Sequence, residues 1–170
     1  MSLTDREFWT VIHGLVLGAI YLLGFSAGLV GLWSFRPEWV TVEGIRERLR
    51  RLQILVWGMA LVAWATVITG TYIVYPWYRA KVPDSPRSIL LGDPSTELWH
   101  RFGMEWKEHI GWVTPILATA VAFMVSYYGP RLAERHRVRY GAIILFAAAF
   151  AAAAVAGVFG AFITKVAPLL

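Results

Sequence analysis

Four stretches of the chain carry no Asp, Glu, Lys or Arg, and each is long enough to cross a lipid bilayer. They cover residues 8–35, 52–78, 109–130 and 140–164. A helix rises about 1.5 Å per residue and the hydrocarbon core is about 30 Å thick, so about 20 apolar residues span it. Backbone groups in lipid must bond within their own segment, which favours helices. The sequence therefore predicts an all-α integral membrane protein, with four transmembrane helices in an up-down-up-down bundle and a single domain over residues 1–170.

The composition agrees with this prediction and excludes several functions. Charged residues make up only 16% of the chain, against about 25% in soluble domains. The net charge of +5 comes from loops between apolar spans, so lipid headgroups rather than nucleic acid are the expected partner. The chain has no cysteine, which excludes disulfides, Fe–S clusters and covalently attached haem.

The basic residues predict the orientation of the bundle. Two short loops, 36–51 and 131–139, hold nine of the sixteen Lys and Arg residues: Arg36, Arg46, Arg48, Arg50, Arg51, Arg131, Arg135, Arg137 and Arg139. The positive-inside rule places these loops in the cytoplasm. Both termini and the long segment 79–108 then lie on the other face, which is periplasmic if the membrane is a bacterial inner membrane.

The segment 79–108 between the second and third spans is expected to be partly helical. Pro83, Pro86 and Pro94 predict an irregular first half. Ser95 has the features of a helix N-cap, and a helix that begins there can continue through His109 into the third span. Pro115 is expected to bend that helix near Gly111.

The four histidines differ in their surroundings. His13 lies inside a span that has no charged residue, where a polar side chain often marks function. The alternative is that His13 reaches toward the outer surface or bonds to a neighbouring backbone. His136 lies among arginines and is expected to be solvated. His100 is expected to pack within the outer segment, although His100 and Met104, four residues apart, also form a possible pair of copper ligands.

His13 and His109 are predicted to lie at one depth. They are 23 and 22 residues from Arg36 and Arg131, which places both about 33–35 Å from the cytoplasmic boundary. Helices one and three lie on a diagonal of such a bundle, roughly 12–14 Å apart. This separation suits two histidines that hold an iron ion between them. Glycines near the same level leave room for a flat ligand, and bases on the same side can pair with haem propionates: Gly14, Gly18, Gly70, Gly157, Gly160, Arg79, Lys81 and Arg101.

With four spans and this histidine pair, the chain resembles the four-helix membrane cytochromes b that anchor respiratory enzymes and react with quinones. The resemblance is one of architecture and includes no family-specific motif. It implies one haem b held by His13 and His109, and electron transfer between a quinol and a partner at the outer face. Helices two and four carry no histidine, so the second haem of the cytochrome b561 type is not expected. The chain is then a subunit of a larger membrane redox complex rather than a stand-alone enzyme.

Two other functions remain open at the level of sequence. One is a cofactor-free structural subunit whose aromatic outer segment docks a partner. The other is a metal-dependent membrane enzyme that uses His13, His100, Glu105 and His109, although the chain has no HExxH motif. Transport is disfavoured because no span contains an acidic residue.

Overall fold

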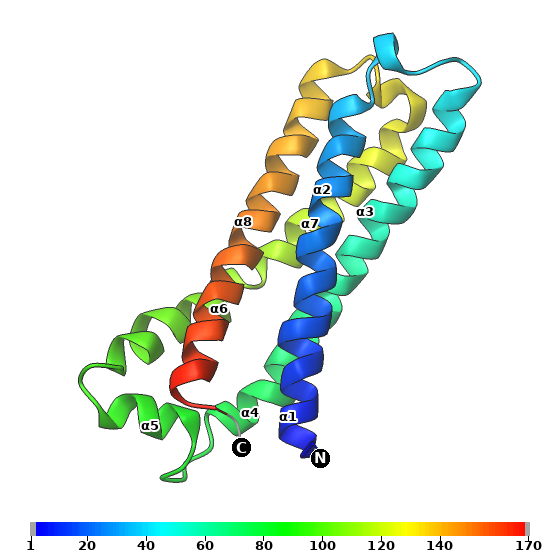
Figure 1. The fold of residues 1–170 in the computed structure, drawn as a ribbon. Coiled ribbons are helices and arrows are strands. Elements are labelled where there is room, and N and C mark those ends of the chain that lie inside the picture. Colours follow the sequence, from blue (N-terminus) through cyan, green and yellow to red (C-terminus); the bar gives the residue numbers. More distant parts are fainter. Residues whose placement is uncertain (1–2, 169–170) are drawn as a thin grey trace.

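The structure, a computed structural model, describes residues 3–168, which form four long helices lying side by side (Figure 1). The four helical runs are Asp5–Ser34, Gly44–Tyr78, Trp99–Leu132 and His136–Val166. All four are long and apolar enough to cross a membrane. The predicted all-α fold with four candidate spans is therefore confirmed.

The runs are divided into shorter elements where the backbone changes its hydrogen-bonding pattern. The first consists of α1 (Asp5–Thr10), η1 (Val11–Leu17) and α2 (Gly18–Ser34), and the second of α3 (Gly44–Thr69), η3 (Gly70–Val74) and α4 (Tyr75–Tyr78). The third consists of η4 (Trp99–Met104), α6 (Glu105–Ile110), α7 (Val113–Tyr128) and η5 (Gly129–Leu132). The fourth is α8 (His136–Val166), and two short helices, η2 (Pro37–Trp39) and α5 (Pro86–Gly92), lie between the runs.

The helices pack as a ring. The main contacts join α2 to α3, α3 to α7, α7 to α8, and α8 back to α2. Helices one and three thus face each other across the diagonal, as predicted. The start of α1 and the end of α8 lie at the same end of the bundle as α5 (Figure 1). We call this the terminal end, and the opposite end, formed by residues 36–51 and 131–139, the arginine end.

A large cluster of buried hydrophobic residues extends from the middle of the bundle to the arginine end. Phe25 stacks on Phe146 and Phe150, with ring centroids 5.2 and 3.9 Å apart. Gly28 makes room for this stack, since a Cβ atom there would lie 2.5 Å from Cζ of Phe146. Large apolar side chains on the outer faces are exposed, for example Leu23 at 77%, as expected of helices that contact lipid.

Polar side chains join the helices where apolar packing alone gives little specificity. The indole nitrogens of Trp57 and Trp64 on α3 donate to Ser126 and Thr119 on α7, each over 3.0 Å. Arg139 is buried on α8 and donates to the carbonyls of Phe35 and Ala133. Such bonds stabilise contacts between helices inside a membrane, and Arg139 ties the end of α2 to the start of α8.

The third run bends where the sequence predicts it. The helix is interrupted at residues 111–112, four residues before Pro115, and α6 turns away from the axis of α7 (Figure 1). Gly111 fits this bend because a Cβ atom there would lie 2.5 Å from the carbonyl oxygen of Lys107. The bend brings η4 and α6 against the last turns of α8.

The segment before η4 differs in detail from the prediction. Its first half contains the helix α5, capped by Ser85, whose hydroxyl accepts the amide of Ser88, and with Pro86 at the first position. Ser95 is not an N-cap. Its own amide donates to the carboxylate of Asp93 over 2.8 Å. That bond holds the pKa of Asp93 below its usual value.

Candidate functional site

His13 contacts the second helical run through a defined hydrogen bond. Its Nδ1 lies 2.8 Å from the carbonyl oxygen of Thr66 and 3.3 Å from the hydroxyl of Thr69. A carbonyl oxygen only accepts, so Nδ1 carries the proton and donates it to Thr66. In the neutral ring Nε2 therefore holds the lone pair, and no partner for it is recorded within residues 3–168.

The ring of His13 occupies the space that a side chain at position 70 would need. A Cβ atom on Gly70 would lie 2.5 Å from Cε1 and 3.1 Å from each ring nitrogen. The predicted level of Gly70, opposite His13, thus agrees with the structure. Here the glycine serves to admit the imidazole.

In the part of the chain that the structure describes, three π-helical segments lie toward the terminal end. η1 contains His13, η3 begins at Gly70, and η4 contains His100. π-Helical turns are rare and often mark functional sites, because each one shifts the rotational phase of the helix. Here two of them meet at the contact between His13 and Gly70.

Lys107 faces the interior from the third run, which the sequence did not predict. Its Nζ lies 2.8 Å from the position that a Cβ atom on Gly160 would take. No hydrogen bond or ion pair of Lys107 is recorded within the described part of the chain. The residue count from the arginine loops places the contact of Lys107 with Gly160 at the depth of the contact of His13 with Gly70. One layer of the bundle therefore holds His13, Gly70, Lys107 and Gly160, one residue from each helical run.

A sequence signal for Lys107 exists in hindsight. The buried residues Thr114, Ala118, Val121 and Val125 of α7 define the inner face. Residues on one face of a helix recur every three or four positions. Counting back from Thr114, this spacing leads first to Gly111 and then to Lys107. The charges beside it hide this pattern, since Lys107 lies between acidic residues of α6.

His109 points away from His13 in this structure. It is exposed, and its Nδ1 is bonded to the backbone carbonyl of Glu105 over 2.8 Å. His109 follows Lys107 by two residues, or about 200° around the helix, so an inward Lys107 turns His109 outward. The structure does not bring His13 and His109 together, and the pairing of the two on an iron ion stays a prediction.

The remaining glycines predicted near a flat ligand do not share one surface. A Cβ atom on Gly14 or Gly157 would meet nothing within 4 Å, and both residues are exposed. Gly18 would meet only a backbone oxygen of its own helix, at 4.0 Å. Of the predicted set, Gly70 and Gly160 face the interior.

Arg79 forms the centre of a polar network at the terminal end. One terminal nitrogen of its guanidinium donates to Glu105 over 2.8 Å and to Glu108 over 2.9 Å, and the hydroxyl of Tyr75 donates to Glu108. Burial alone would lower the pKa of Arg79, but the hydrogen bond to Glu108 and the nearby charges of Glu108 and Glu105 together outweigh burial and raise that pKa. This network ties the end of the second run to α6.

The arginines predicted to bind propionates already have carboxylate partners. Arg79 has two, and Arg101 pairs with Glu97 over 2.5 Å on the surface. Arg101 also lines a polar cavity of about 360 Å³ with Arg87, Leu91, His100 and Glu105. The buried Nε of Arg87 has no hydrogen-bond partner among residues 3–168.

His100 packs as the sequence predicts. It is buried, and its Nδ1 lies 2.8 Å from the hydroxyl of Tyr78. Its predicted alternative partner, Met104, is buried on the same turn. The last histidine, His136, is exposed at the start of α8, where its ring nitrogen is bonded to Arg139. Within residues 3–168 no three His, Cys, Asp or Glu side chains lie together as a metal centre would require.

A search of protein-family models, of curated proteins and of solved structures finds no match to this chain.

Proposed function

We propose that the chain is a membrane-embedded electron-transfer subunit that binds one haem b, with Nε2 of His13 as an axial ligand. The observation that carries this proposal is the hydrogen bond from Nδ1 of His13 to Thr66. Histidines that bind metals commonly donate their second nitrogen to a carbonyl, which fixes the tautomer and the ring orientation. His13 is prepared in the same way, inside an apolar span.

The fit of haem to the surrounding residues is incomplete. His13 supplies one ligand, while the exposed His109 would have to turn inward to supply the second. Lys107 already faces the interior beside Gly160, in the same layer as His13, and a neutral amine is also a possible iron ligand. Haem, once bound, would supply a one-electron couple. The protein's part is to orient the His13 ring, to surround the group with apolar side chains, and to place a quinol or partner subunit near the terminal end.

Absorbance of the purified protein tests the proposal directly. A bis-axially ligated haem b gives a sharp reduced α-band, and His13→Ala should abolish it. His109→Ala and Lys107→Met then identify the second ligand, and His100→Ala is the matched control because His100 bonds to Tyr78. A spectrum unchanged by His13→Ala would refute the role of His13.

The second candidate is a cofactor-free subunit that docks a partner through its terminal end. It is supported by the pairing of Arg79 with Glu105 and Glu108, because an arginine occupied by carboxylates has less capacity for propionates. Absence of haem from protein purified from its native membrane, by pyridine haemochrome assay, would favour this candidate. Retention of haem in stoichiometric amount would exclude it.

A further inference from the structure

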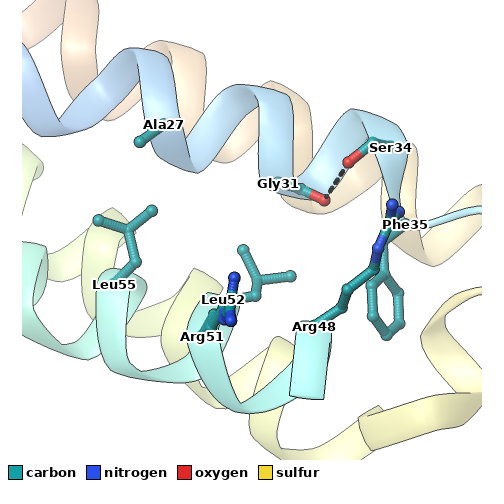
Figure 2. A pocket seen from close by; sticks show the side chains of 8 residues that line it. All are labelled: Ala27, Gly31, Ser34, Phe35, Arg48, Arg51, Leu52 and Leu55. Carbon is teal, nitrogen blue, oxygen red and sulfur yellow. Dashed lines mark hydrogen bonds between the residues drawn. The ribbon is translucent and has the colours of Figure 1, made fainter. Parts of the chain in front are cut away.

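At the arginine end, α2 and α3 enclose a cavity that combines an apolar interior with two guanidinium groups (Figure 2). Its volume is about 180 Å³, and its lining residues are Ala27, Gly31, Ser34, Phe35, Arg48, Arg51, Leu52 and Leu55. Pockets that bind a whole small molecule usually measure about 300–1,000 Å³. This smaller cavity therefore suits one part of a larger molecule, with the rest of that molecule outside the cavity.

The walls come from the two helices and are apolar toward the middle of the bundle. Ala27 and Gly31 on α2 lie opposite Leu52 and Leu55 on α3 (Figure 2). A Cβ atom on Gly31 would lie 3.0 Å from Leu52, so the helices approach closely there. The slot has the polarity and narrow shape that suit an alkyl chain.

The mouth of the cavity is basic. Arg48 reaches from α3 toward the last turn of α2, where Ser34 and Phe35 lie (Figure 2). It makes no recorded hydrogen bond or ion pair within residues 3–168. Arg51 is bonded only through Nε to the exposed Glu47, over 2.7 Å, which leaves its other nitrogens available. Two guanidinium groups at the end of an apolar slot fit a phosphate that carries an acyl chain.

We propose that this cavity binds one anionic phospholipid, with an acyl chain between α2 and α3 and the phosphate against Arg48 and Arg51. Basic pockets between transmembrane helices are a recurring way to hold anionic headgroups. The site is independent of the proposed haem, because it lies at the opposite end of the bundle from His13. The lipid would fill the space between the two helices and stabilise their packing.

The test is native mass spectrometry of the full chain in neutral detergent, titrated with phosphatidylglycerol and, separately, with phosphatidylcholine. One phosphatidylglycerol should bind more tightly than phosphatidylcholine. Arg48→Gln with Arg51→Gln should weaken that binding about thirtyfold, which is about 2 kcal/mol at 1.4 kcal/mol per tenfold. The control is Arg46→Gln with Arg50→Gln, two exposed residues on the same turns that do not line the cavity.

Two further variants, measured in the same titration, distinguish binding of a lipid from binding of a free anion. Ala27→Leu keeps both guanidiniums but fills the apolar slot, and it should also weaken phosphatidylglycerol binding. Glu47→Gln should tighten it, since Arg51 then loses its competing carboxylate. Equal losses in the two arginine pairs would overturn the proposal in favour of a general charge effect. Displacement of the lipid by inorganic phosphate, together with full binding in Ala27→Leu, would overturn it in favour of an anion site.

Discussion

Gly70→Ala tests the contact on which the candidate site rests. Ordinary van der Waals contact to a Cβ atom begins at 3.4 Å, but the ring of His13 would lie at 2.5 Å. The imidazole must therefore retreat by about 0.9 Å, which stretches the 2.8 Å bond to Thr66 beyond hydrogen-bonding distance. The bond contributes about 0.5–1.5 kcal/mol and the overpacking costs about 1–3 kcal/mol.

These costs are partly offset, because alanine is a better helix former than glycine by about 0.5–1 kcal/mol. We therefore expect Gly70→Ala to destabilise the bundle by about 1–3 kcal/mol. Gly58→Ala is the matched control on the same helix, where a Cβ atom meets nothing within 4 Å. It should be neutral or stabilise by up to about 1 kcal/mol.

Unfolding in mixed micelles with increasing SDS, followed by circular dichroism, measures both variants. The double variant His13→Ala/Gly70→Ala removes the ring that the new methyl group would strike. In the His13→Ala background, the cost of Gly70→Ala should therefore disappear. If Gly70→Ala costs the same with and without the imidazole, the ring does not fill that space and the reasoning fails.

Three other predictions concern the two ends of the bundle. Arg139→Met leaves the carbonyls of Phe35 and Ala133 without their hydrogen-bond donor. It should lower the free energy of unfolding by about 2–5 kcal/mol in the same assay. The control, Arg137→Met at an exposed position, should change that free energy by about 0.5 kcal/mol or less. The pKa of Asp93 is lowered by its bond to Ser95, so the turn it caps is stabilised above pH 3.8 and loses that stabilisation as the pH falls through the lower, folded pKa. Hydrogen exchange should show this loss of protection in the wild type, and Asp93→Asn should remove the pH dependence. Reporter fusions after Arg51 and Arg135 should be cytoplasmic and a fusion at Asp84 external; the reverse result would contradict the positive-inside prediction.

The sequence predicts the four spans and the bend in the third one because both depend on residues close together in the chain. A run of twenty apolar residues has few alternatives to a membrane helix. Pro115 removes a backbone donor wherever it lies in a helix, so the break at Gly111 can be predicted without knowing the fold. The short connections at the arginine end likewise force helix one to pack on helix two, and helix three on helix four.

Depth in the membrane is also predictable, since it needs only a count of residues from the arginines. That count placed Gly70 near the level of His13, and the structure has the two in contact. Rotation about the helix axis is harder to predict. A helix that is apolar on every side shows no polar face, so its sequence does not reveal which residues face the neighbouring helices. His109, Gly14 and Gly157 are predicted to face the interior, but in the structure they are exposed.

The π-helical segments add a second source of error in rotation. Each one inserts an extra residue into a turn, so that residues on its two sides no longer follow a single 100° step. η4 forms the start of the third run, directly before α6 and Lys107. The rings of Trp99, Phe102 and Trp106 all contact Phe159 of α8, while Phe102 stays 53% exposed.

The layer of His13, Gly70, Lys107 and Gly160 follows from steric fit rather than from hydrophobic pattern. Each glycine admits one polar side chain from a different run, His13 beside Gly70 and Lys107 beside Gly160. A bundle that only had to pack would fill both positions with apolar side chains, because a polar group in hydrocarbon has a high cost unless it has a partner. His13 has such a partner in Thr66, whereas none is recorded for Lys107 within residues 3–168. The unpaired amine of Lys107 is therefore the feature of this layer that packing alone does not explain. Lys107→Met separates a lysine that binds the iron from a lysine that the bundle merely tolerates. If the lysine is merely tolerated, the variant should be more stable than the wild type and its absorbance spectrum should be unchanged.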